Sequence, residues 1–157
     1  KTANDEFAAA QKLCPNDPRL EYAMGLALWN HGRRDEAVRW FDISARLDGG
    51  MPPFLPAAQA AAWSRLVIGE RDAGLRQVVL TARALGQSRG DYPTQIQREH
   101  SALFLGRATG YLSGPGFSIE TAELDKRSLD EIASLIPTDL KPLFDKGHGQ
   151  IVERHQE

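Results

Sequence analysis

Apolar residues recur at every third or fourth position over most of the chain, which is the spacing of amphipathic α-helices. Residues 18–48 show this pattern most clearly, as two helices separated by a short turn at residues 31–33. The apolar stripe of the first helix consists of Tyr22, Leu26 and Trp29. The stripe of the second consists of Ala37, Val38, Phe41 and Ala45. The segment therefore predicts an antiparallel pair of helices.

The same periodicity predicts helices along the rest of the chain, separated by glycine and proline. One helix lies within residues 1–17, and the others are expected at residues 58–68, 73–85, 94–112, 118–136 and 138–146. Pro137 divides the last two. Ser128 and Glu131 have the spacing of a capping box, which leaves open that residues 118–136 form two shorter helices. The predicted fold class is all-α.

Small residues recur along the chain with the helix pairs. Gly25 and Ala37 stand where two helices of a pair must approach closely. Gly69 and Gly74 lie 37 residues after Gly32 and Ala37, so residues 52–87 repeat the arrangement of residues 18–50. The residues that carry the strongest pattern are Met24, Gly25, Leu28, Gly32, Ala37, Phe41 and Leu47.

At these spacings the chain resembles the tetratricopeptide repeat family, whose helix pairs recur about every 34 residues. Glu21 replaces the first aromatic residue of the family pattern, and Gly49 replaces its closing proline. The resemblance covers residues 1–86 well and residues 94–113 more weakly, and it does not extend into the tail. It implies a superhelix of helical hairpins over residues 1–113. Residues 1–17 would be the second helix of a truncated repeat, residues 94–113 a single helix, and residues 114–157 an irregular helical cap.

In the family that the chain resembles, the first helix of each pair lines a concave groove that receives a peptide or another protein. Mapped through Gly25, the groove positions here are Arg19, Tyr22, Ala23, Leu26, Trp29 and Asn30. Aromatic residues beside an arginine are typical of an interface hot spot. The alternative is that the apolar stripe packs against a preceding repeat or the chain's own tail. The positions of the family's carboxylate clamp hold Tyr22 and Leu26, which argues against a chaperone C-terminal tail as ligand.

A candidate basic ridge repeats with the fold. Arg39 and Arg46 on one second helix are matched 37 residues later by Arg76 and Arg83. Members of each pair are seven residues apart and share a helix face, so together they can face phosphate or acidic partners. A solvated helix face is the ordinary role of such charges. No aromatic residue is interleaved to stack a base, which argues against nucleic acid.

Catalytic and metal chemistry has little support in the chain. The stretch GQSRG at residues 86–90 fits the letters of a nucleophile elbow around Ser88, but that turn needs a strand before it and a helix directly after it. Here a helical pattern precedes it and Pro93 follows closely, so an inter-helix loop is the expected structure. The four histidines are scattered and Cys14 is the only cysteine, so we expect no catalytic residue, metal site or cofactor.

Charge and composition narrow the remaining classes of function. The formal net charge is −2, which provides no overall basic field for nucleic acid or membrane binding. Residues 118–157 are acidic, with nine carboxylates against five basic side chains. No apolar stretch is long enough for a spanning helix. The single cysteine fits a reducing compartment such as the cytoplasm. Because the chain begins without methionine or a leader, we expect a piece of a longer protein.

These features predict a protein–protein interaction scaffold that binds a peptide or protein partner in its groove. The alternative is a structural or regulatory helical segment of a larger protein with no external ligand of its own. A third hypothesis, that the protein is a serine hydrolase, is supported by the GQSRG stretch alone.

Overall fold

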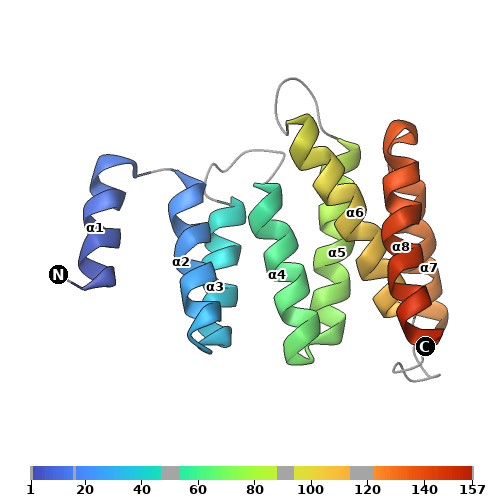
Figure 1. Ribbon diagram of the computed structural model, residues 1–157, viewed down its shortest axis with the longest axis horizontal. Helices are drawn as coiled ribbons and strands as arrows, with labels where there is room; N and C mark the ends of the chain where they lie inside the picture. The colour runs from blue at the N-terminus through green and yellow to red at the C-terminus, as the bar shows by residue number, and fades with distance from the viewer. Residues whose placement is uncertain (1, 16, 47–53, 88–93, 114–121, 157) are drawn as a thin grey trace.

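The computed structural model describes residues 2–15, 17–46, 54–87, 94–113 and 122–156, and all regular structure in these ranges is helical (Figure 1). This confirms the predicted all-α fold class. The helices are α1 (Ala3–Leu13), α2 (Pro18–Asn30), α3 (Arg34–Arg46), α4 (Leu55–Ile68), α5 (Arg71–Gly86), α6 (Gln95–Leu112), α7 (Ala122–Leu135) and α8 (Lys141–Gln156), with a 3₁₀ turn, η2 (Thr138–Leu140), before α8. None of these helices is long and apolar enough to cross a membrane.

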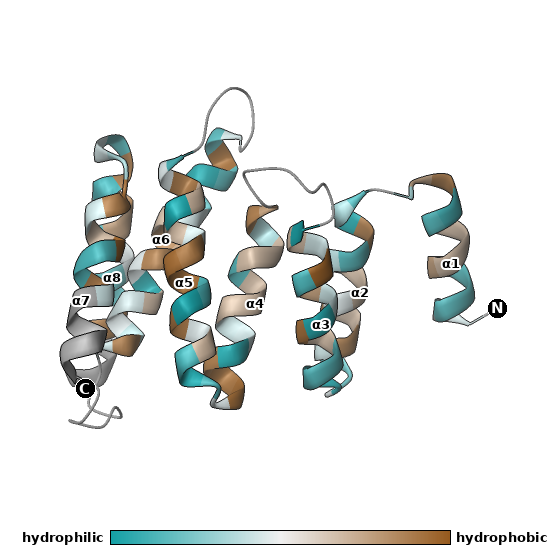
Figure 2. Ribbon diagram, turned by 180° about the vertical axis from the view of Figure 1, so that it is seen from behind, coloured by the Kyte–Doolittle hydropathy of each residue, from teal (hydrophilic) through white to brown (hydrophobic). Residues whose placement is uncertain are grey.

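The helices stand side by side in a row that follows their order along the chain (Figure 1). α2 packs on α3, α3 on α4 and α4 on α5. Figures 1 and 2, drawn from opposite sides, show α2, α4, α6 and α8 on one face of the row and α3, α5 and α7 on the other. The first helix of each predicted pair therefore lies on the same face.

The turns between paired helices are made by equivalent glycines. Gly32 joins α2 to α3 with a φ of +80°, and Gly69 joins α4 to α5 with a φ of +91°. Glycine adopts this left-handed conformation without the steric cost that a side chain would add. The two turns, which lie 37 residues apart, therefore both use a glycine in the left-handed conformation.

The small residues inside the pairs allow the close approach that was predicted for them. A Cβ atom added at Gly25 would lie 2.5 Å from Cε1 of Phe41, and one at Gly74 would lie 2.7 Å from Cδ2 of Leu66. Ala37 has no exposed surface. A larger side chain at these positions would push the paired helices apart.

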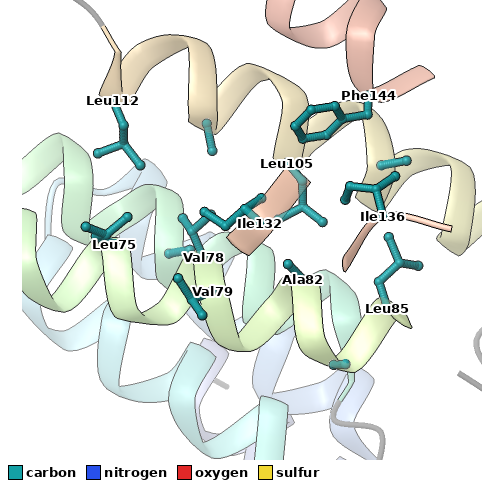
Figure 3. Close-up of a cluster of buried hydrophobic side chains, with 14 of the residues drawn as sticks. Leu75, Val78, Val79, Ala82, Leu85, Leu105, Leu112, Ile132, Ile136 and Phe144 are labelled. Atoms are coloured by element: carbon teal, nitrogen blue, oxygen red, sulfur yellow. The ribbon is translucent and has the colours of Figure 1, made fainter. Parts of the chain in front are cut away.

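Three groups of buried side chains form the core of the described residues. Ala45 of α3 packs with Ala57 and Ala58 of α4 in one of them, and the other two are more extensive. The smaller lies among α2, α3 and α4 and consists of Leu28, Ala37, Phe41 and Ala61. The larger joins α4, α5, α6, α7 and α8, and Figure 3 shows it as a cluster of apolar side chains that includes Ile132, Leu105 and the ring of Phe144. Ile132 and Leu105 have no exposed surface. The C-terminal helices are therefore part of the main core.

The tail differs from its predicted form in two respects. α7 is one helix from Ala122 to Leu135, so Ser128 lies inside it and does not cap a second helix. α8 runs to Gln156, well past the predicted end at Lys146. α7 packs on α5 and α8 packs along α6, so both continue the alternation between the two faces of the row (Figures 1 and 2). The predicted helix start at residue 118 lies outside the described residues.

Glycines explain why α8 continues past Lys146. Gly106 of α6 faces the backbone of Phe144, and Gly147 of α8 faces the backbone of Leu103. Glycine lowers helix propensity by about 1 kcal/mol relative to alanine. Here that cost is offset by close packing between the backbones of α6 and α8. The spacing of apolar residues within one helix does not reveal this packing.

An ion pair between α3 and α4 provides a test of the stacking between successive helix pairs. Arg65 donates to both carboxylate oxygens of Asp42, at 2.9 and 2.5 Å, and this hydrogen bonding raises the pKa of the Arg65 guanidinium. The Arg65 side chain is only 16% exposed. We expect Asp42→Asn to lower the free energy of unfolding by about 1–3 kcal/mol, because a partly buried cation loses its counter-charge.

Chemical denaturation measures this effect, and Asp145→Asn is the matched control. Asp145 is an exposed carboxylate of α8, so its amide variant should shift stability by about 0.5 kcal/mol or less. Equal losses in the two variants would show that the α3 to α4 ion pair contributes nothing specific.

Candidate functional site

A groove of about 610 Å³ opens on the face formed by α2, α4, α6 and α8. Its apolar lining consists of Tyr22, Pro56, Ala60, Trp63, Phe104 and Ile151. Its polar lining consists of Gln59, Gln97, His100, Arg107 and Gln150. Four helices that are distant in sequence thus contribute side chains to one concave surface.

The residues that α4 supplies to the groove follow from the repeat. Gln59 and Trp63 lie 37 residues after Tyr22 and Leu26, so they occupy the same two positions on the next first helix. Gly32 and Gly69 are also 37 residues apart, so adding this offset to the predicted groove positions Tyr22 and Leu26 gives Gln59 and Trp63. The sequence therefore carried the signal for this part of the lining.

The residues that α6 supplies follow from a second alignment. Leu105 and Gly106 match the pair Met24 and Gly25. In that register Phe104 and Arg107 take the positions of Ala23 and Leu26. Gln150 and Ile151 of α8 have no such signal, because the resemblance does not reach the tail.

The polar side chains of the groove are held in place by contacts among the helices. Arg107 donates from Nε to Oε1 of Gln150 at 3.0 Å, which links α6 to α8. Gln59 donates from Nε2 to the hydroxyl of the buried Ser101 at 2.5 Å, which links α4 to α6. Hydrogen bonds between side chains of α4, α6 and α8 therefore stabilise the wall of the groove.

Aromatic side chains form the apolar part of the groove. Trp63 makes an edge-on contact with Tyr111, with ring centroids 5.7 Å apart, and it is 37% exposed. Tyr22 contacts Phe41 and Phe54 at 5.9 and 6.0 Å, and its burial raises the pKa of the phenol. These contacts hold the rings in fixed orientations while part of their surface faces the groove.

Of the residues predicted to line the groove, only Tyr22 is among those that surround this volume. Leu26 is 40% exposed on the same helix, and Ala23 and Asn30 are exposed. Trp29 is half-buried against the smaller core cluster, with the Arg34 guanidinium 4.9 Å above its ring. Tyr22 and Trp29 therefore contribute to packing against α3 and the start of α4, whereas the alternative interpretation of this stripe named a preceding repeat or the tail. Tyr22 also faces the groove.

Arg19 has a local role at the start of α2. Its guanidinium pairs with Asp17, the N-cap residue, at 2.6 Å. Hydrogen bonds from Arg19 lower the pKa of Asp17 to about 2. Because this pKa lies below the ordinary value of 3.8, the contribution of Asp17 to stability is present above about pH 4 and is lost as the pH falls toward 2.

The four arginines of the candidate basic ridge are exposed on α3 and α5. Arg83 is paired with Glu131 of α7 at 2.5 Å, so one of the four cations already has a carboxylate partner. Arg76 and Arg83 also line a smaller cavity of about 340 Å³ between α5 and α7. The ridge is thus interrupted by a contact within the protein.

Ser88 of the GQSRG stretch lies outside the described residues. The residues before it form α5, which is a helix where a nucleophile elbow needs a strand. A Cβ atom at Gly86 would lie 2.9 Å from the carbonyl oxygen of Leu135, so this glycine lets α5 approach the end of α7. Within the described ranges, no group of three His, Cys, Asp or Glu residues is placed to hold a metal ion.

Compared with models of known protein families, with curated protein sequences and with solved structures, the chain matches none of them. The class of protein is therefore defined by its fold and its groove: an all-α row of helices with a semi-open groove on one face.

Proposed function

We propose that this protein is a tetratricopeptide-like interaction scaffold that binds a peptide segment of a partner protein in the groove of α2, α4, α6 and α8. The repeated turns at Gly32 and Gly69 and the close contacts at Gly25 and Gly74 support the repeat architecture. The alternation of helices between two faces supports a surface formed by the first helices.

The composition of the groove is the observation that carries the proposal. Aromatic side chains with exposed ring surface stand beside an arginine and three glutamine amides. Tryptophan, tyrosine and arginine are enriched among residues that dominate binding energy at interfaces. Side-chain amides can donate to and accept from the backbone of an extended peptide. The groove therefore has the chemistry of a peptide site and lacks a nucleophile with a paired base.

Selection of displayed random peptides on the folded protein tests this proposal. We expect enriched peptides whose affinity falls about tenfold or more in Trp63→Ala, because truncating a hot-spot aromatic removes its buried contact area. Titration of synthetic peptides by fluorescence anisotropy measures the change.

Leu80→Ala is the control for this variant. Leu80 is 53% exposed on α5 and does not line the groove, so its removal should change affinity by less than about twofold. Thermal unfolding of Trp63→Ala checks that losing the contact with Tyr111 leaves the protein folded. Failure to enrich any peptide, or equal losses in both variants, would contradict the proposal.

The alternative, a structural segment of a larger protein, is favoured by one observation. Leu13 at the end of α1 is 83% exposed, and α1 makes few contacts with α2. Its apolar surface can be covered by a further helix of the same protein. Absence of any groove-dependent peptide in the selection would support this alternative.

A further inference from the structure

We propose that the groove selects an acidic residue within its peptide ligand, and that Arg107 binds the carboxylate while aromatic and apolar side chains of the ligand fill the surface on both sides. This inference rests on the proposed function of the groove and specifies the chemistry of its ligand.

The charge of the groove is the first argument. Among the described residues that line the groove, Arg107 is the only lysine, arginine, aspartate or glutamate, so none of these side chains is a carboxylate. This is unusual for a chain that carries 21 acidic residues against 19 basic ones. A cation that faces a concave surface without a counter-charge favours an anionic ligand group.

The position of the guanidinium is the second argument. Arg19, Arg33, Arg65, Arg83 and Arg98 are each paired with a carboxylate of the protein. Within the described part of the chain, Arg107 has no such partner and bonds only to Gln150. That bond uses Nε, and no described residue bonds to the two terminal nitrogens of the guanidinium, which can therefore bind an incoming carboxylate. An arginine oriented in this way can bind a carboxylate through two hydrogen bonds.

The surroundings of Arg107 indicate an internal residue of the ligand. Phe104, which lines the groove, precedes Arg107 by about one turn of α6. Trp63, which also lines the groove, contacts Tyr111, about one turn after Arg107. Apolar ligand side chains can therefore pack on either side of the bound carboxylate. A C-terminal carboxylate would leave one of these two surfaces uncovered, so we commit to an aspartate or glutamate flanked by large apolar residues.

The peptide selection described above, followed by a charge cycle, tests the inference. We expect enriched peptides to carry an acidic residue between large apolar ones. Replacing that residue by its amide should weaken binding to the unaltered protein about tenfold or more, and should have almost no effect on Arg107→Gln. An Arg107→Glu variant should prefer the peptide in which lysine replaces the acid. Because Arg107 is exposed, we expect both variants to fold, and circular dichroism checks this.

Two further probes, together with the outcome of the peptide selection, separate the sources of failure. A peptide with an amidated C-terminus should bind as well as its free acid; a large loss would overturn the assignment to an internal residue. Enriched peptides that depend on Trp63 but carry no acid would overturn this inference and leave the proposed function standing. Absence of enrichment would overturn both. A fluorescent oligothymidylate should not bind, and binding that is lost in Arg107→Gln would assign the groove to nucleic acid.

Discussion

Replacing Gly106 with alanine is expected to destabilise the protein by about 3 kcal/mol, because the added methyl group meets the backbone of another helix. A Cβ atom at Gly106 would collide with the carbonyl oxygen of Phe144 and lie 2.9 Å from the backbone nitrogen of His148. Backbone atoms cannot rotate away as a side chain can. The methyl group can be accommodated only if α6 and α8 separate, and that separation opens the larger core cluster around Leu105.

Gly149→Ala in α8 is the matched control for this substitution. Among the described residues, apart from the nearby backbone of α8 itself, no atom would lie within 4 Å of a Cβ atom at Gly149. The alanine should therefore stabilise the helix by up to about 1 kcal/mol through its higher helix propensity. Urea denaturation of both variants measures the difference. A loss at Gly106 no larger than the change at Gly149 would show that α6 and α8 are not in close contact.

Truncating Phe41 to alanine is expected to cost about 3–5 kcal/mol, since it leaves a cavity in a small core cluster. Phe41 is 2% exposed and packs with Leu28, Ala37 and Ala61. This cluster joins α2, α3 and α4, so its loss loosens two helix interfaces at once. Ile43→Ala on the same helix is the control: Ile43 is 46% exposed, and its truncation should cost less than about 1 kcal/mol.

A double-mutant cycle identifies the contact that places Phe41. Gly25→Ala alone should cost about 1–3 kcal/mol, because the new Cβ atom would lie 2.5 Å from the Phe41 ring. In a Phe41→Leu background the same substitution should cost less, since the smaller side chain leaves room for the methyl group. Additive costs would mean that Gly25 and Phe41 do not face each other.

Local patterns were sufficient to predict α2 and α3. Their apolar residues have helical spacing, and Gly32 supplies the turn between them. The same rules predicted residues 58–68 and 73–85 within α4 and α5, with starts that are two or three residues late. Helix starts are hard to predict because the first turn has few intrahelical hydrogen bonds. Prediction of α7 and α8 was less accurate. Ser128 has the spacing of a capping residue but lies inside α7, and α8 continues through Gly147, which packs against α6.

The candidate site could be predicted only in part. Tyr22 followed from the repeat pattern, and the 37-residue offset applied to it also leads to Gln59 and Trp63. Gln150 could not be predicted, because its link to Arg107 spans 43 residues and depends on how α8 lies along α6. That arrangement depends in turn on the contact between the two helix backbones at Gly106 and Gly147.

The amino-acid sequence by itself determined where most helices form and which small residues lie between paired helices, because both depend on side chains within one or two turns of each other. Only the tertiary structure decided how far α8 extends and which side chains meet in the groove. Those features depend on burial between helices distant in sequence, and that burial offsets the poor local helix propensity of glycine.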